Sequence, residues 1–186
     1  MPTAIAKLTS VSPYSQSRYH ATPKNDKEAP DDYEKRTWMN RCHTDTDGNI
    51  FIPPMAFKNC LDEAAKYLSI KIPNKGNATY TKHFEAGVLV LEPVPIGLHI
   101  DKIEGEWLFL NADGVRGGGK RVLKCYPVIR QWSVPVTYHI FDDTLTQDVF
   151  RHHLEEAGKF IGIGRFRPRM RGFYGRFDVA DIDWQK

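Results

Sequence analysis

The sequence predicts an α+β fold in which one antiparallel sheet carries two helices on one face. Two segments place apolar residues at offsets of four, three and four, which is the buried stripe of a helix. Several shorter segments alternate apolar and polar residues as strands do. These elements follow one another as strand, helix, strands, helix and strand, and two packed layers satisfy that order. At 186 residues, the chain is long enough for one such domain.

The first half of the chain supplies a strand and the first helix. Residues 3–11 alternate and suit a strand, whereas residues 21–48 are polar and interrupted by prolines, so we expect a loop insertion with little core of its own. Residues 50–52 are a short buried-strand candidate. Pro53-Pro54 then begins a helix, which ends at Pro73. Its stripe is Phe57, Leu61, Ala64 and Leu68.

Strands dominate the middle of the chain. Residues 86–91 read as a buried strand, and residues 98–110 predict a hairpin that turns near Glu104-Gly105. The glycine-rich residues 111–121 are expected to form a mobile basic connector. It leads into a strand at residues 122–126.

The last third of the chain supplies a strand, the second helix and the final strand. Residues 134–140 alternate as a strand, although Pro135 argues for an edge or a bulge. A helix begins near residues 144–146, where Thr144 and Gln147 have capping-box spacing. Its stripe is Phe150, Leu154, Ala157 and Ile161, and Gly162 and Gly164 end it. A final strand is expected to run from Phe173 to Trp184. This order predicts a single ferredoxin-like or RRM-like domain over residues 1–186.

Composition limits the class of protein. Hydrophobic residues make up 41% and charged residues 26%, which is ordinary for a soluble globular chain. The three cysteines are widely spaced, so they predict neither a metal knuckle nor a disulfide framework. No signal peptide and no apolar run of membrane-spanning length is present. We therefore expect no membrane partner and a cytoplasmic location.

Basic residues gather in two windows that contain no acid. Residues 114–130 carry +5 and residues 159–177 carry +6, so the rest must carry −8 for the total of +3. Two basic segments on an acidic body predict a polyanionic partner.

The segment after the second helix, residues 162–177, is the strongest functional candidate. We call it the post-helix loop. Its glycines allow a ligand backbone to approach, and its five arginines offer forked donors for phosphate. Phe166 and Tyr174 supply faces on which bases could stack, while Phe173 and Phe177 alternate with the final strand and are expected in the core. The alternative is a glycine stop followed by a solvated basic turn.

A glycine-rich loop after the last helix of such a fold resembles the RAMP superfamily, the RNA-binding proteins that build CRISPR effector complexes. Residues 50–65, Ile-Phe-Ile-Pro-Pro-Met-Ala-Phe-Lys-Asn-Cys-Leu-Asp-Glu-Ala-Ala, resemble a second segment of the backbone subunits, with Pro54 and Met55 in place of the usual glycine-serine. The resemblance implies that Lys58 lies against the RNA backbone. Because the chain departs from the usual pattern and is short for a backbone subunit, we expect a compact stand-alone relative, encoded by a phage or mobile element.

Two further segments add candidates. Residues 116–121 could clamp phosphates, or could form a flexible solvated turn. Residues 12–18 could face nucleic acid, or could form a polar turn stabilised by serine side chains. The sequence thus predicts a set of nucleic-acid-binding residues: Ser15, Gln16, Arg18, Lys58, Arg116, Lys120, Arg121, Gly162, Gly164, Arg165, Phe166, Arg167, Arg169, Arg171, Tyr174 and Arg176.

Three functions follow. The first is a non-catalytic protein that binds single-stranded RNA or DNA, with RNA favoured, self-associates along the strand, and partners CRISPR effector subunits. It needs no cofactor, metal or catalytic residue. The second is a RAMP-type endoribonuclease, for which residues with no surrounding motif are available: His20, Asp31, Asp32, His43 and Asp45. The third is a phage-encoded interaction protein or mimic that acts on a host CRISPR complex.

Overall fold

The computed structural model describes residues 2–112, 117 and 119–185, and a four-stranded antiparallel sheet forms its centre. The strand order is β4-β8-β1-β9. The strands are β1 (Thr3–Ser10), β4 (Val88–Leu89), β8 (Ser133–Ile140) and β9 (Phe177–Gln185).

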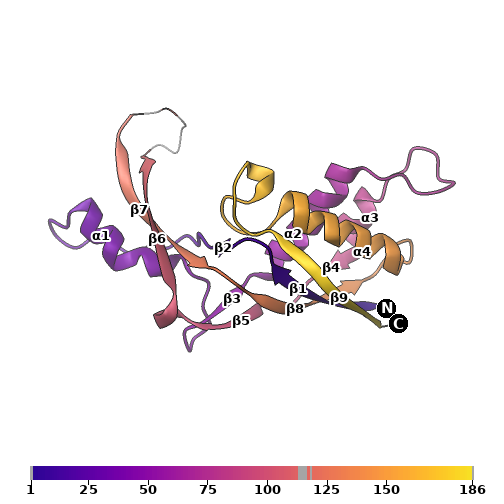
Figure 1. Ribbon diagram of the computed structural model, residues 1–186, viewed down its shortest axis with the longest axis horizontal. Coiled ribbons are helices and arrows are strands. Elements are labelled where there is room, and N and C mark those ends of the chain that lie inside the picture. The colour runs from indigo at the N-terminus through magenta and orange to yellow at the C-terminus, as the bar shows by residue number, and fades with distance from the viewer. Residues whose placement is uncertain (1, 113–116, 118, 186) are drawn as a thin grey trace.

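Two helical segments cover one face of this sheet. Helix α2 (Pro54–Leu68) lies between β1 and β4 in the chain, and α4 (Gln147–Glu156) with the π-helix η3 (Ala157–Ile161) lies between β8 and β9. Figure 1 shows both on the same side of the sheet. This connectivity and strand order are those of a ferredoxin-like or RRM-like fold, so the predicted α+β class is confirmed.

The alternation seen in the sequence sets the register of the central strands. Ala4, Ala6 and Leu8 of β1 lie opposite Tyr138, Val136 and Val134 of β8, and all six side chains are buried beneath the helices. The predicted stripes of α2 and α4 meet them there. Because side chains alternate between the faces of a sheet, a shift of one residue would expose this whole set.

A second group of strands extends from the sheet. β6 (Glu104–Asn111) and β7 (Arg121–Ile129) form a long hairpin, which β2 (Tyr14–Ser15) extends on the β7 side. β3 (Asn49–Ile52) pairs with β5 (Val94–His99), and the short η2 (Ile100–Lys102) leads into β6. In Figure 1 the β6–β7 hairpin rises away from the body, on the same side as the helices.

The hairpin predicted within residues 98–110 is wrong. Glu104 pairs with Val128 and the ladder runs on to Asn111 and Arg121, so Glu104-Gly105 begins a strand. Gly105 is needed for packing, because a Cβ there would meet Cys125 Sγ and the Trp38 ring. The predicted connector 111–121 lies between β6 and β7, and its residues 113–116 and 118 lie outside the described residues.

The prediction of a loop for residues 21–48 is also wrong in part. The segment contains helix α1 (Pro30–Thr37) and the 3-10 helix η1 (Trp38–Arg41). Glu34 anchors α1 to β7: its buried carboxylate accepts a 2.8 Å hydrogen bond from the Cys125 N–H and pairs with Arg41 at 2.7 Å and Lys124 at 3.2 Å. A helix held by a buried carboxylate has no apolar stripe, so periodicity misses it.

Several boundaries differ from the predictions. Helix α2 ends at Leu68, where Ser69 takes a left-handed conformation, before Pro73. Helix α3 (Thr81–Gly87) occupies the start of the strand predicted from residue 86. Thr146, rather than Thr144, caps α4 by accepting from the Val149 N–H.

Pro135 lies in β8, an inner strand of the central sheet, yet it is tolerated. The short edge strand β4 pairs with β8 only at His139 and Ile140, so the Pro135 position lies beyond the reach of β4. Within the described residues, no helix is both long and apolar enough to cross a lipid bilayer.

Candidate nucleic-acid interface

The post-helix loop is fixed to the body through its main chain. The Gly162 N–H closes the π-turn by donating to Ala157 O at 2.9 Å. The Arg165 N–H donates to Ser15 O at 2.9 Å, and the Gly175 N–H donates to Pro13 O at 2.7 Å. The loop therefore lies against the connection that follows β1. Figure 1 shows it between the β6–β7 hairpin and the helices.

The two predicted loop glycines serve packing. Both have positive φ, +70° at Gly162 and +79° at Gly164, a region that favours glycine. A Cβ at Gly164 would overlap the Tyr14 ring and the Ser15 carbonyl oxygen. Gly164 therefore lets the loop close onto β2, and Gly162 lets it close onto its own Pro168 and Gly175.

Arg165 occupies the centre of the site. Its guanidinium carbon lies 3.8 Å from the centroid of the Tyr126 ring and 5.2 Å from that of Tyr174. Its Nε donates to Ser15 Oγ at 3.3 Å. The side chain is only 14% exposed, and burial lowers the pKa of its guanidinium from the ordinary value.

One nitrogen of Arg165 lacks a hydrogen bond. Nη2 is buried and has no hydrogen-bond acceptor among the residues that the structure describes, since Glu106 Oε2 lies 3.9 Å away. A buried donor of this kind costs free energy until an acceptor reaches it. Charged donors bind oxyanions well, so an anionic ligand fits this position.

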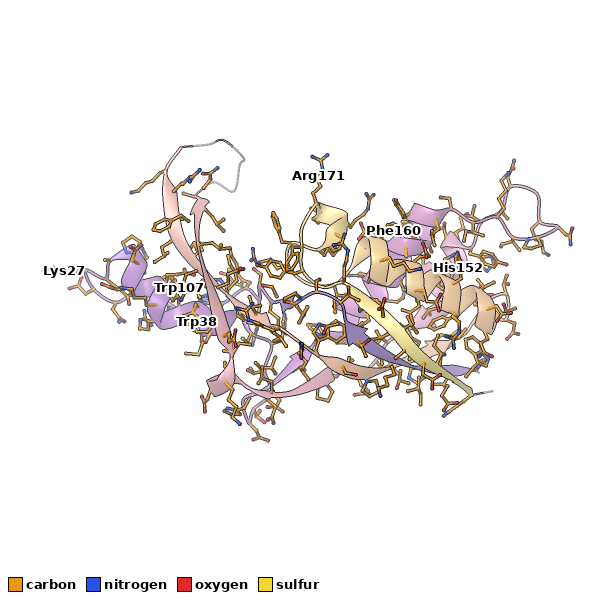
Figure 2. The ribbon with its side chains drawn as sticks, in the orientation of Figure 1. Lys27, Trp38, Trp107, His152, Phe160 and Arg171 are labelled. Atoms are coloured by element: carbon orange, nitrogen blue, oxygen red, sulfur yellow. The ribbon has the colours of Figure 1, made fainter. Side chains whose placement is uncertain are left out.

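The other loop arginines divide into paired and unpaired groups. Arg167 and Arg169 both contact Glu63 of α2, at 3.0 Å and 3.2 Å. Arg176 donates to Lys159 O at 3.2 Å. Arg171 is exposed without a carboxylate partner in the described part of the chain, and it points away from the loop tip in Figure 2. The loop therefore does not present five unpaired positive charges, because two of its arginines are ion-paired and a third is hydrogen-bonded to a carbonyl oxygen.

Two adjoining clefts flank Arg165. The helix cleft, about 380 Å³, lies between the loop and the start of α2 and includes His43, Met55, Asn59 and Arg167 in its lining. The hairpin cleft, about 910 Å³, lies between the loop and the β6–β7 hairpin. Ser17 and Arg165 line both clefts. The loop, α2 and the hairpin thus converge on one arginine.

The lining of the hairpin cleft is more apolar. It combines the aliphatic side chains of Leu110 and Val122 with the Tyr126 ring, and Phe166 and Met170 contribute from the loop. Lys124 and Arg171 add positive charge at its edge.

The segment after β1 has a mainly structural role. Ser15 and Gln16 are buried, and Gln16 joins β3 to the segment after η1 by donating to Phe51 O at 2.8 Å and accepting from the His43 N–H at 2.6 Å. Arg18 is exposed. Gln16 still lines the helix cleft, whereas Ser15 supports Arg165 from behind.

Lys58 lies away from the clefts. Its side chain is 7% exposed, its ammonium contacts both carboxylate oxygens of Asp62 at 2.5 Å, and it also donates to the carbonyl oxygens of Phe84 and Glu85. These contacts join α2 to α3 and occupy the ammonium. The geometry contradicts the phosphate role that the family resemblance implies.

Two aromatic residues of the loop lie elsewhere than predicted: Tyr174 is buried and Phe173 is exposed. Tyr174 is buried and its hydroxyl donates to Glu106, so it supports Arg165 from below. Phe166 is 57% exposed, as expected of a residue available for stacking. Phe173, expected in the core, is 58% exposed because β9 begins only at Phe177, which is buried.

The structure describes only part of the basic connector, residues 111–121. Lys120 and Arg121 are exposed at the far end of the β6–β7 hairpin, without ion pairs among the described residues. Arg116 lies outside the described residues.

The open face of the central sheet does not suit nucleic acid. The register places Lys7, Pro135 and Asp181 side by side on this face, and Ile5, Thr137 and Asp183 beside them. RRM domains stack bases on aromatic residues of this face. Here those six positions hold no aromatic residue and two carboxylates.

Three important residues were not predicted from the sequence. Tyr126, Glu106 and Glu63 come from strands and a helix far from the loop in the chain, and each contacts a loop side chain. None stands in a motif. Tyr126 and Glu106 pair directly across the β6–β7 hairpin, so correct hairpin pairing was the signal that could have found them.

The strand order of the central sheet and its two helices define a ferredoxin-like α+β fold. Comparison with solved structures agrees. The chain is similar to Cmr6 from Pyrococcus furiosus with a TM-score of 0.51 and 12% sequence identity, over 97% of this chain and 99% of that chain. At this identity the similarity shows the fold alone. No family model matches the sequence, and no curated protein matches it.

Proposed function

We propose that this chain binds single-stranded nucleic acid, with RNA favoured, in the two clefts that meet at Arg165. The observation that carries the proposal is the desolvated Arg165 guanidinium, held on Tyr126 with one nitrogen lacking an acceptor. An arginine fixed in this way is preorganised for a phosphate, because its planar fork needs little further ordering.

The helix cleft suits the phosphate. Helix α2 begins there without a side-chain cap and without an acid in its first turn, so the positive end of its dipole is uncompensated. Met55 and Ala56 of this first turn line the cleft opposite Arg165 and Arg167. An anion in the cleft would meet positive potential from both sides.

The hairpin cleft suits a base. Its walls offer the exposed Phe166 ring and aliphatic surface, and its edge carries Lys124 and Arg171. Aromatic rings next to cations bind unpaired bases with little sequence preference. A phosphate on one side of Arg165 and its base on the other is the arrangement that a single strand provides.

Salt-dependent binding tests the proposal. Fluorescence anisotropy with labelled single-stranded RNA should give a linear fall of log K with log salt, and each lost phosphate contact should reduce its slope by about 0.7. Arg165→Ala and Arg171→Ala should each weaken binding and lower the slope. Arg130→Ala is the control, because Arg130 is exposed, is paired with Glu104 and lines neither cleft. Equal affinities of all four proteins would reject the proposal.

The proposal also includes protein partners of this chain. Cmr6 is a RAMP-containing subunit of a Type III-B CRISPR complex, and the shared fold supports an association of this chain with CRISPR effector subunits. Self-association along the strand and a phage or mobile-element origin belong to the same proposal. Light scattering with and without a long oligonucleotide measures the self-association. Co-purification after nuclease treatment distinguishes a protein partner, or a mimic of one, from an RNA-bridged partner.

An endoribonuclease is the second candidate, on one observation. Of the five histidines and acids considered for catalysis, His43 alone is among the residues lining the helix cleft in the described structure. Burial, aided by Arg18, lowers the pKa of His43, so its imidazole is neutral near pH 7 and able to accept a proton. Intact end-labelled RNA after long incubation with excess protein, with and without divalent metal, would reject this candidate.

A further inference from the structure

A pair of exposed aromatic side chains lies outside both clefts. Tyr67 near the end of α2 and Phe160 of η3 are 52% and 47% exposed, and their ring centroids are 5.7 Å apart with the planes at 35°. Large aromatic side chains are more often buried or used at interfaces. We call this pair the aromatic platform.

The local fold holds the platform outward. Gly158 of η3 packs against β9 so closely that a Cβ would overlap the Phe177 carbonyl oxygen. Ala157, Gly158 and Ile161 are buried, which directs Lys159 and Phe160 away from the sheet. π-helical turns of this kind are frequent at functional sites.

The platform is continuous with the post-helix loop. The Arg169 guanidinium carbon lies 5.6 Å from the centroid of the Tyr67 ring, while its Nε contacts Glu63. Figure 2 shows Phe160 on the same side of the molecule as the loop tip at Arg171. Arg169 therefore belongs to the loop and to the platform at once.

Positive charge is in excess only on the side of the platform that faces the post-helix loop. Lys66 and Lys159, next to the two rings in the chain, pair with Glu85 and Glu156 and also lie near Asp62 and Asp178. On the loop side, Arg167 and Arg169 both pair with Glu63. Arg176 has no carboxylate partner among the described residues, and Arg167 and Arg169 share one.

We propose that Tyr67 and Phe160 form a second base-stacking site, which binds an unpaired base of the same strand after its backbone has passed Arg169. This proposal rests on the proposed function. A single strand fits these observations because it supplies both an aromatic face for the rings and a phosphate for the surplus cations. A purely apolar protein surface would leave those cations uncompensated.

Substitution of the platform tests the proposal by affinity. Tyr67→Ala and Phe160→Ala should each weaken binding of a single-stranded RNA of about 16 nucleotides by about fivefold to a hundredfold. Tyr67→Trp should keep wild-type affinity and Tyr67→Leu should not, because only the ring stacks. Phe141→Ala is the matched control, since Phe141 is similarly exposed just after β8. These side chains are at the surface, so the variants should fold.

Photocrosslinking gives a direct readout. RNA with 5-iodouridine should crosslink to Tyr67 or Phe160, identified by mass spectrometry of the digested complex. Wild-type binding that depends on Arg165 but not on Tyr67, without such crosslinks, would overturn the platform and leave the proposed function intact. Absence of any RNA binding by the wild-type protein would remove both. Loss of a co-purifying protein in Tyr67→Ala, with RNA affinity unchanged, would overturn the platform in favour of protein docking.

Discussion

Replacing Lys58 with methionine separates a structural role from a nucleic-acid role. Methionine keeps most of the side-chain volume and removes the charge, which leaves the Asp62 carboxylate and the Phe84 and Glu85 carbonyl oxygens without their shared donor. Removing one partner of a buried ion pair costs about 3–5 kcal/mol. For a chain of this length each kcal/mol lowers Tm by about 2–4 °C. We expect Tm to fall by about 6–20 °C.

The assay combines thermal unfolding with the salt dependence of RNA binding. Lys66→Met is the matched control on the same helix, because Lys66 forms an exposed pair with Glu85 and such pairs contribute about 0–1 kcal/mol. Lys58→Met with Asp62→Leu should recover part of the lost stability, since the lone carboxylate is then gone. If Lys58→Met instead keeps its Tm and lowers the salt slope by about 0.7, Lys58 contacts phosphate and our interpretation of its ion pair is wrong.

Two further predictions concern pH and loop geometry. Burial lowers the pKa of His153, whose ring lies 4.4 Å from Phe84, so the folded protein keeps it neutral while the unfolded chain takes up a proton below about pH 6.5. Stability should fall as pH drops through this value, and His153→Leu should reduce the fall in denaturant titrations between about pH 7.5 and 5.5; an unchanged pH profile would exclude His153 as a cause. Gly164→Ala should destabilise the fold by about 1–3 kcal/mol, because φ is +79° and the new methyl meets Tyr14. It should also weaken RNA binding, and a variant with wild-type Tm and affinity would show that the loop adapts.

Local pattern was sufficient to predict the central sheet and its helices. Ala4, Ala6 and Leu8 alternate, and the stripe of α2 repeats at helical spacing, because each element buries one face against the same core. Turn residues were less reliable. Gly105 looked like a turn but sits inside a strand, where it makes room for Trp38.

The candidate site was located in the sequence, but its internal organisation was not. The density of arginines and glycines in residues 162–177 predicted a binding loop there, and that role stays a prediction. Which arginine is buried depends on Tyr126 and Glu106 from the hairpin, and which are paired depends on Glu63 from α2. These contacts join residues that are distant in the chain, so no local pattern contains them.

The post-helix loop is held by its peptide groups as well as by its side chains. Its amides at Ile163, Arg165 and Gly175 donate to carbonyl oxygens of the main chain, and so do those at Gly172 and Tyr174. Substitution at the exposed position 173 can therefore alter ligand preference without changing the path of the loop, whereas Phe166 and Arg171 have positive φ and the loop glycines have no room for a Cβ. In evolution or in the laboratory, such a frame allows new specificities to be sampled on an unchanged scaffold.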